Sequence, residues 1–129
     1  ERYDLATNAW EVVAPMATPR ENHAMAALDG KMYAVGGFNE DDGALSSVER
    51  YDPAANAWEA VAPMMAARDY LAVAVLDGKL YAAGGRNDDD GYLSSVERYD
   101  PTANAWAAVA PMAEERDELA VAVLDGKLY

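Results

Sequence analysis

The stretch LAVAVLDGKLYAAGGRNDDDGYLSSVERYDPTANAWAAV at residues 71–109 decides the fold. Its first six residues, 71–76, alternate bulky and small side chains, which predicts a strand packed on both faces. Asp77 and Gly78 suit the two positive-φ positions of a type I′ turn, and residues 80–83 run back as a second strand. The stretch therefore opens with a β-hairpin.

The remainder of this stretch predicts two more strands. A glycine pair ends the second strand, and a polar loop at residues 86–94 leads to a third strand at 95–100. Pro101 opens a tight turn in which Asn104 suits a left-handed conformation, and a fourth strand follows at 106–109. The unit is thus a four-stranded antiparallel meander, which is too small to bury its own faces and must stack on neighbours.

The same unit recurs along the chain at a constant spacing. Residues 1–48 are identical to residues 49–96 at 32 of 48 positions, and residues 97–129 match the second copy at 27 of 33. We therefore expect one repeat array over residues 1–129. Its parts are the last two strands of a unit at 1–16, full repeats at 17–64 and 65–112, and the first two strands of a unit at 113–129.

Composition limits the partners that the chain can have. Its 129 residues hold 23 Asp and Glu against 10 Lys and Arg, a net charge of -13, which repels nucleic acid and anionic lipid. The absence of cysteine excludes disulfides and thiolate zinc sites. No apolar run approaches the roughly 18 residues that cross a bilayer. We expect a soluble acidic protein with no nucleic-acid or membrane partner, and without a targeting signal its localisation stays open.

Each copy carries a glycine pair after its second strand, then a tyrosine, then a tryptophan seven residues later. These residues are Gly36, Gly37, Tyr51 and Trp58, and again Gly84, Gly85, Tyr99 and Trp106. The combination resembles the kelch repeat of β-propellers. The resemblance implies an all-β, six-bladed kelch β-propeller with four-stranded antiparallel blades, of which this chain supplies about three. Because its copies are nearly identical, the chain most resembles designed or consensus symmetric kelch propellers.

Three blades' worth of strands cannot close a ring alone, because propellers close with about four to eight blades. The chain opens with the last two strands of a unit and ends with the first two, so its ends are complementary. We expect a second copy, related by a two-fold axis, to complete a six-bladed ring. Three full units would also need the positions that correspond to 34–48, which the third copy lacks. Two explanations stay open: the half-ring is nicked there, or the sequence is the repeating part of a longer symmetric chain.

The copies differ mainly in two connections, the one before each first strand and the loop between the second and third strands. In such a meander both emerge on one rim, where the natural kelch adaptors that the chain resembles bind peptides. The candidate binding residues on this rim are Asn22, His23, Phe38, Tyr70, Arg86, Tyr92 and Glu118. Those adaptors use basic residues to hold acidic peptides. The Asn, Tyr and Glu present here favour a basic peptide, a cation or another protein copy, and tolerant loop positions on a bare scaffold are the alternative.

Nothing in the sequence assembles a catalytic or metal centre. His23, the only histidine, is expected on the surface and is too few for a zinc site or a copper propeller enzyme. Residues 88–91, DDDG, partly resemble a calcium loop, although strands flank them, and divalent-cation binding there stays open. We expect a non-catalytic propeller scaffold without cofactor or metal, closed by a second copy and able to self-assemble. A peptide- or protein-recognition module of the kelch adaptor type is the alternative.

Overall fold

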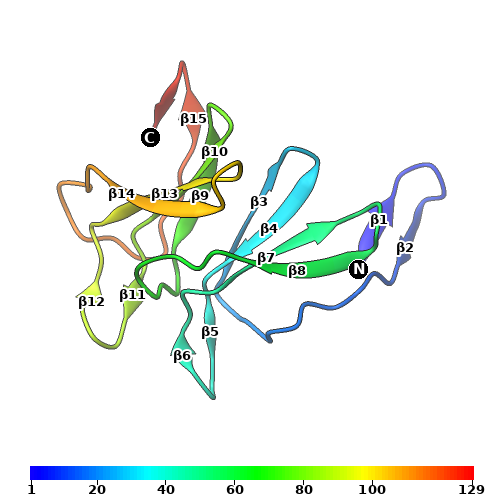
Figure 1. Cartoon of the computed structure of the whole chain (residues 1–129), viewed down its shortest axis with the longest axis horizontal. Coiled ribbons are helices and arrows are strands. Elements are labelled where there is room, and N and C mark those ends of the chain that lie inside the picture. The colour runs from blue at the N-terminus through cyan, green and yellow to red at the C-terminus, as the bar shows by residue number, and fades with distance from the viewer.

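The computed structural model describes all 129 residues as strands, turns and loops (Figure 1). No helix long and apolar enough to cross a membrane occurs in it. Two complete sheets carry the fold, each with its four strands in chain order. The first comprises β3 (Ala24–Leu28), β4 (Lys31–Val35), β7 (Val48–Asp52) and β8 (Ala57–Val61). The second comprises β9 (Ala72–Leu76), β10 (Lys79–Ala83), β13 (Val96–Asp100) and β14 (Ala105–Val109). The predicted antiparallel meander is confirmed.

Each end of the array carries a two-stranded hairpin. At the N-terminal end β1 (Arg2–Asp4) pairs with β2 (Ala9–Glu11), and at the C-terminal end β15 (Val123–Leu124) pairs with β16 (Lys127–Leu128). The last pair is shorter than the corresponding β9 and β10. Backbone hydrogen bonds between Ala122 and Tyr129, both of 2.9 Å, continue the pairing of β15 and β16 to the last residue. Figure 1 shows the sheets arranged as successive blades, with the two hairpins at opposite ends.

Turn geometry agrees with the sequence at both predicted positions. Both central residues of a type I′ turn require a positive φ, and Asp77 and Gly78 have φ values of 49° and 67°. Asn104, between β13 and β14, has φ 47°. These local signals fix the register of the hairpins, because a tight turn aligns the strands that it joins.

The hydrophobic core lies between the two complete blades. Leu28, Tyr33 and Val35 of the first blade are buried in one cluster with Leu80 and Tyr99 of the second. The ring centres of Tyr33 and Tyr99 lie 5.8 Å apart in a tilted arrangement, which aromatic pairs favour. Neither blade buries these faces alone, so blade stacking supplies most of the apolar burial.

A polar latch joins the outer edges of neighbouring blades. Trp106 in β14 donates its indole Nε1–H to the carbonyl of Ala62 at 2.8 Å. Asn104 Oδ1 accepts the N–H of the same Ala62 at 2.9 Å. Trp58 and Asn56 bind Ala14 in the same way, at 2.9 and 3.0 Å. The tryptophan of each complete repeat, Trp58 or Trp106, therefore binds its own blade to the chain that leaves the preceding one.

A buried ion pair clamps the connection that enters each blade. The side chain of Arg68 is fully buried, and its Nη2 lies 2.9 Å from Oε2 of Glu97 in β13. The same guanidinium donates to the carbonyls of Gly84 and Ser95 at 2.8 and 3.0 Å. Arg20 and Glu49 form the equivalent 2.9 Å pair in the first blade. Buried charges are stable only when paired and hydrogen-bonded in this way.

Glu49 shows how the clamp affects ionisation. Burial by itself raises the pKa of its carboxyl. Hydrogen bonds from the Arg20 guanidinium and from the N–H groups of Ala17 and Thr18 outweigh burial, so the pKa lies below the ordinary glutamate value. The Glu49 carboxylate therefore stays charged while it accepts hydrogen bonds from the connection that enters the blade.

Candidate functional site: the loop rim

The rim is built from hairpins that the sequence did not predict. Residues 86–94, expected as a polar loop, contain β11 (Arg86–Asn87) and β12 (Gly91–Tyr92). The first blade has β5 (Phe38–Asn39) and β6 (Gly43–Ala44) in the same place. Asn87 Oδ1 accepts the N–H groups of Asp89 and Asp90 at 3.0 and 2.7 Å, and Gly91 has φ 74°. This side-chain capping turns a polar run into an ordered hairpin.

The connection before each first strand lies against these hairpins, as predicted. Glu21 pairs with Phe38, and Asp69 pairs with Arg86, in isolated antiparallel bridges. The second glycine of each pair makes the approach possible. A Cβ on Gly85 would lie 2.5 Å from the carbonyl oxygen of Asp69, and its φ of 87° also disfavours other residues. The glycine pair therefore brings both variable connections onto one rim.

Three candidate residues occupy equivalent positions with an unusual backbone. Asn22, Tyr70 and Glu118 have φ values of 51°, 51° and 48°. The N–H of Tyr70 donates to the carbonyl of Asn22 at 3.1 Å, and the N–H of Glu118 donates to the carbonyl of Tyr70 at 3.0 Å. The left-handed conformation is uncommon for Tyr and Glu. These residues thus form a chain of backbone hydrogen bonds that runs from blade to blade.

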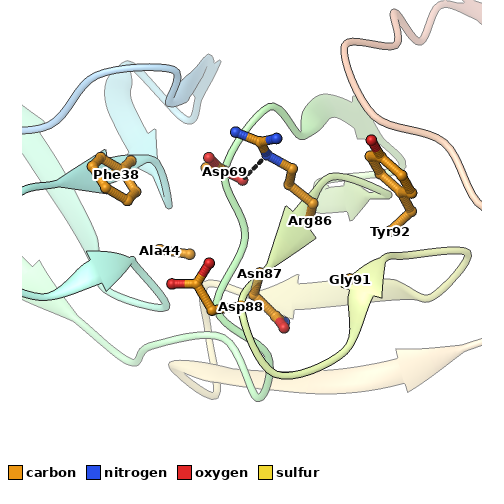
Figure 2. A pocket seen from close by; sticks show the side chains of 8 residues that line it. All are labelled: Phe38, Ala44, Asp69, Arg86, Asn87, Asp88, Gly91 and Tyr92. Atoms are coloured by element: carbon orange, nitrogen blue, oxygen red, sulfur yellow. Dashed lines mark hydrogen bonds and ion pairs between the residues drawn. The ribbon is translucent and has the colours of Figure 1, made fainter.

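A pocket of about 330 Å³ opens between the hairpins of the two complete blades. Figure 2 shows Arg86 near its centre, with its guanidinium turned toward Asp69, Phe38 on one side and Tyr92 on the other. The remaining lining residues are Ala44, Asp69, Asn87, Asp88 and Gly91. Of the predicted candidates, Phe38, Arg86 and Tyr92 therefore meet in one place.

Arg86 is the only basic residue that lines this pocket. Its Nε lies 3.3 Å from Oδ1 of the buried Asp69, and its guanidinium carbon lies 5.0 Å from the centre of the Tyr70 ring. The Asp69 carboxylate raises the pKa of Arg86 above its ordinary value, against a smaller opposing effect of desolvation. The terminal nitrogens of the guanidinium have no partner in the chain, so they are free to donate to a ligand. Asp69 was missed by the sequence analysis, because an aspartate in a polar connection carries no signal of burial.

The other candidates lie apart from the pocket. Asn22 and Glu118 are both exposed and contact Tyr70 through backbone hydrogen bonds. His23 is half-buried, with its Cβ close to Gly37 and part of its side chain still exposed at the surface. Burial and the positive charge of Arg20 lower the pKa of His23 below its ordinary value. No three His, Cys, Asp or Glu side chains gather in a way that could hold a metal ion.

Comparison with known proteins gives the family. A model of the Kelch motif matches residues 19–65 and 67–113. Human Kelch-like protein 30 is 49% identical over 39 residues, which are 30% of this chain and 7% of that protein. The Influenza virus NS1A-binding protein homolog of Mus musculus is 48% identical over 46 residues, 36% of this chain and 7% of that protein. The matched segments thus span less than a tenth of these relatives.

The architecture also matches a solved structure. That of YjhT superposes on 92% of this chain with a TM-score of 0.77, while the chain covers 35% of YjhT at 22% sequence identity. This likeness concerns the fold. The repeats are Kelch motifs, and the fold is that of a β-propeller to which this chain contributes about three blades. With two consecutive motifs over most of its length, the chain belongs to the Kelch-motif family.

Proposed function

We propose that this chain is a non-catalytic, designed or consensus-type β-propeller scaffold that closes into a six-bladed ring with a second copy. The observation that carries the proposal is the state of the two end hairpins. Trp10 is 67% exposed, whereas its equivalents Trp58 and Trp106 are half-buried and latched to a preceding blade. The close match between successive repeats supports a symmetric assembly, because each blade interface then repeats.

Ring closure is tested by the mass of the protein in solution. The chain has a mass of 13.9 kDa, so the proposed ring has a mass of about 28 kDa. Size-exclusion chromatography with light scattering should give the larger value over a wide range of protein concentration. A folded species that stays at the mass of one chain would refute the proposal.

The pocket around Arg86 supports a second candidate function, recognition of a peptide or protein on the loop rim. Arg86 offers unpaired guanidinium nitrogens between two aromatic side chains, Phe38 and Tyr92. Asp69 offsets its charge, and the overall net charge of -13 repels acidic ligands. A basic peptide with an acceptor group for Arg86 therefore fits this face better than an acidic one.

The two candidates give different results in a binding experiment. Immobilised protein is exposed to basic, neutral and acidic peptide pools, and Arg86→Ala serves as the variant. Recognition at the rim predicts enrichment of a defined basic sequence that is lost in Arg86→Ala. Lys79→Ala, which alters a partly exposed ion pair away from the rim, should retain it. A bare scaffold predicts no enrichment by either protein.

A further inference from the structure

A second hollow, of about 340 Å³, opens on the rim of the first blade. Phe38 lines it and also lines the pocket around Arg86, so the two hollows are neighbours. Main-chain hydrogen bonds of 3.0 and 2.9 Å between Glu21 and Phe38 fix one wall. We call it the Glu21 hollow, and its lining residues are Pro19, Arg20, Glu21, Phe38, Asn39 and Glu40.

The second blade shows what the same position holds there. Asp69 and Arg86 lie 48 residues after Glu21 and Phe38, so they are the repeat equivalents. Nε of Arg86 lies 3.3 Å from Oδ1 of Asp69, so this carboxylate binds a guanidinium of its own chain. Phe38 cannot supply such a group, because its ring carries no charge. The first blade therefore keeps the acidic half of the pair and lacks the cation.

The exposed charges around the Glu21 hollow are negative. Glu21 and Glu40 are exposed, and neither has an ion-pair partner in the chain. Arg20 is the only basic residue of the lining, but its side chain is fully buried and its Nη2 lies 2.9 Å from Oε2 of Glu49. The charge of Arg20 is thus offset inside the blade, and two carboxylates remain for a ligand.

An aromatic ring completes the site. In the second blade the guanidinium carbon of Arg86 lies 5.0 Å from the centre of the Tyr70 ring. Phe38 brings a half-buried ring to the Glu21 hollow, and aromatic rings attract cations within about 6 Å of their centres. A guanidinium can donate to carboxylates and stack on a ring at the same time, whereas an ammonium is compact and strongly hydrated. The hollow therefore suits arginine better than lysine.

We infer that the Glu21 hollow binds an arginine side chain of a peptide partner. The guanidinium donates to the carboxylates of Glu21 and Glu40 and lies against the ring of Phe38, so that the partner supplies the cation that Arg86 supplies in the second blade. The inference rests on the proposed recognition of a basic peptide at the rim, and it names the side chain that this face selects. Because both hollows share Phe38, one peptide can place its arginine here and its acceptor group on Arg86.

A peptide titration followed by NMR tests the assignment. The probe is acetyl-Gly-Ser-Arg-Ser-Gly-amide, and its control is the same peptide with citrulline, which has a neutral urea group in place of the guanidinium. Each is added to uniformly 15N-labelled chain, and the amide spectrum reports the affinity, the position of binding and the folding of each variant.

Three variants of the chain accompany the titration. Glu21→Gln removes one carboxylate and keeps the shape of the side chain. Phe38→Arg rebuilds the ion pair of the second blade, so that the chain fills its own hollow. Asp41→Asn is the matched control, because it removes a carboxylate from the tip of the same hairpin but does not line the hollow.

The arginine peptide should shift the amide signals of Glu21, Phe38, Asn39 and Glu40, and the citrulline peptide should not. Glu21→Gln should weaken binding about two- to fivefold, the range of exposed charge pairs, and Phe38→Arg should abolish it. Asp41→Asn should bind as the unchanged chain does.

Other results would overturn the inference. Equal binding of the two peptides would show that the guanidinium is not recognised. Shifts confined to β11 and β12, with no effect of Glu21→Gln, would overturn the assignment and leave recognition at Arg86 standing. Equal losses in Glu21→Gln and Asp41→Asn would show a general effect of negative charge without a site. No shift with either peptide at millimolar concentration would refute arginine binding, whereas recognition at the rim fails only if the peptide pools are not enriched either.

Discussion

Replacing Glu97 by Gln tests whether the buried clamp stabilises the fold by fixing the connection that enters the second blade. The Glu97 side chain is almost fully buried and its two oxygens accept four hydrogen bonds, from the N–H groups of Met65 and Ala66 and from Nε and Nη2 of Arg68. Glutamine has a similar shape but only one acceptor oxygen. Its NH2 group would point N–H donors at the N–H groups that now donate to Glu97. The substitution therefore removes charge and acceptors without leaving a cavity.

The expected loss follows from this geometry. Leaving one partner of a buried ion pair uncompensated costs about 3–5 kcal/mol. An unsatisfied buried donor costs about 1–3 kcal/mol, so two displaced N–H groups give a loss of similar size. We expect Glu97→Gln to lower the free energy of unfolding by about 3–5 kcal/mol, a large part of the roughly 5–15 kcal/mol of an ordinary domain.

Urea denaturation at one fixed protein concentration measures this loss, because the stability of an oligomer depends on concentration. The matched control is Glu59→Gln, which disrupts the ion pair of Arg50 with a carboxylate that is 54% exposed. Exposed pairs contribute at most about 1 kcal/mol, so the control should change little. Equal losses in the two variants, or a loss below about 1 kcal/mol for Glu97→Gln, would refute a stabilising clamp.

Further predictions concern a close backbone approach and two titrating groups. Gly37→Ala should destabilise by about 1–3 kcal/mol more than Gly30→Ala in urea denaturation, because both have positive φ but only at Gly37 would the Cβ meet backbone, at 2.6 Å. Equal effects would contradict this. The pKa of His23 is lower in the folded protein than the unfolded value near 6.5. The stability that this difference contributes is therefore fully present above that pH and is lost progressively as the pH falls below it. His23→Leu should therefore flatten the unfolding free energy between about pH 7.5 and 5.5, and an unchanged slope would count against burial of the imidazole. Glu49 has a lowered pKa as well, so its contribution is present above about pH 4.5 and is lost as the pH falls toward the folded value. Glu49→Gln should be less stable at neutral pH and show a shallower decline in acid, whereas parallel curves would show that Glu49 does not titrate with folding.

Signals that act over a few residues made most of the fold predictable. The alternation of residues 71–76 and the Asp77-Gly78 turn depend on sterics and turn geometry, which belong to the local chain. The constant repeat spacing then implied stacking, because one meander cannot bury both of its faces. Blade order and the position of the variable rim followed from that.

The buried polar groups were harder to foresee. Charged residues in polar connections resemble surface residues, and burial of Arg68 or Asp69 appears only when another blade covers them. The left-handed backbone of Tyr70 has no signal in its side chain, since it depends on hydrogen bonds to neighbouring blades. The hairpin at residues 86–92 depends on capping by Asn87, a side chain that serves equally well in an irregular loop.

Native mass spectrometry of an equimolar mixture of unlabelled and uniformly 15N-labelled chain, unfolded together and refolded, tests ring closure most directly. Two-copy closure predicts ions of about 28 kDa in three isotopic forms in the ratio 1:2:1, with no assembly of three chains. Ions of a single folded chain at 13.9 kDa, or a four-form pattern at three times the chain mass, would contradict it.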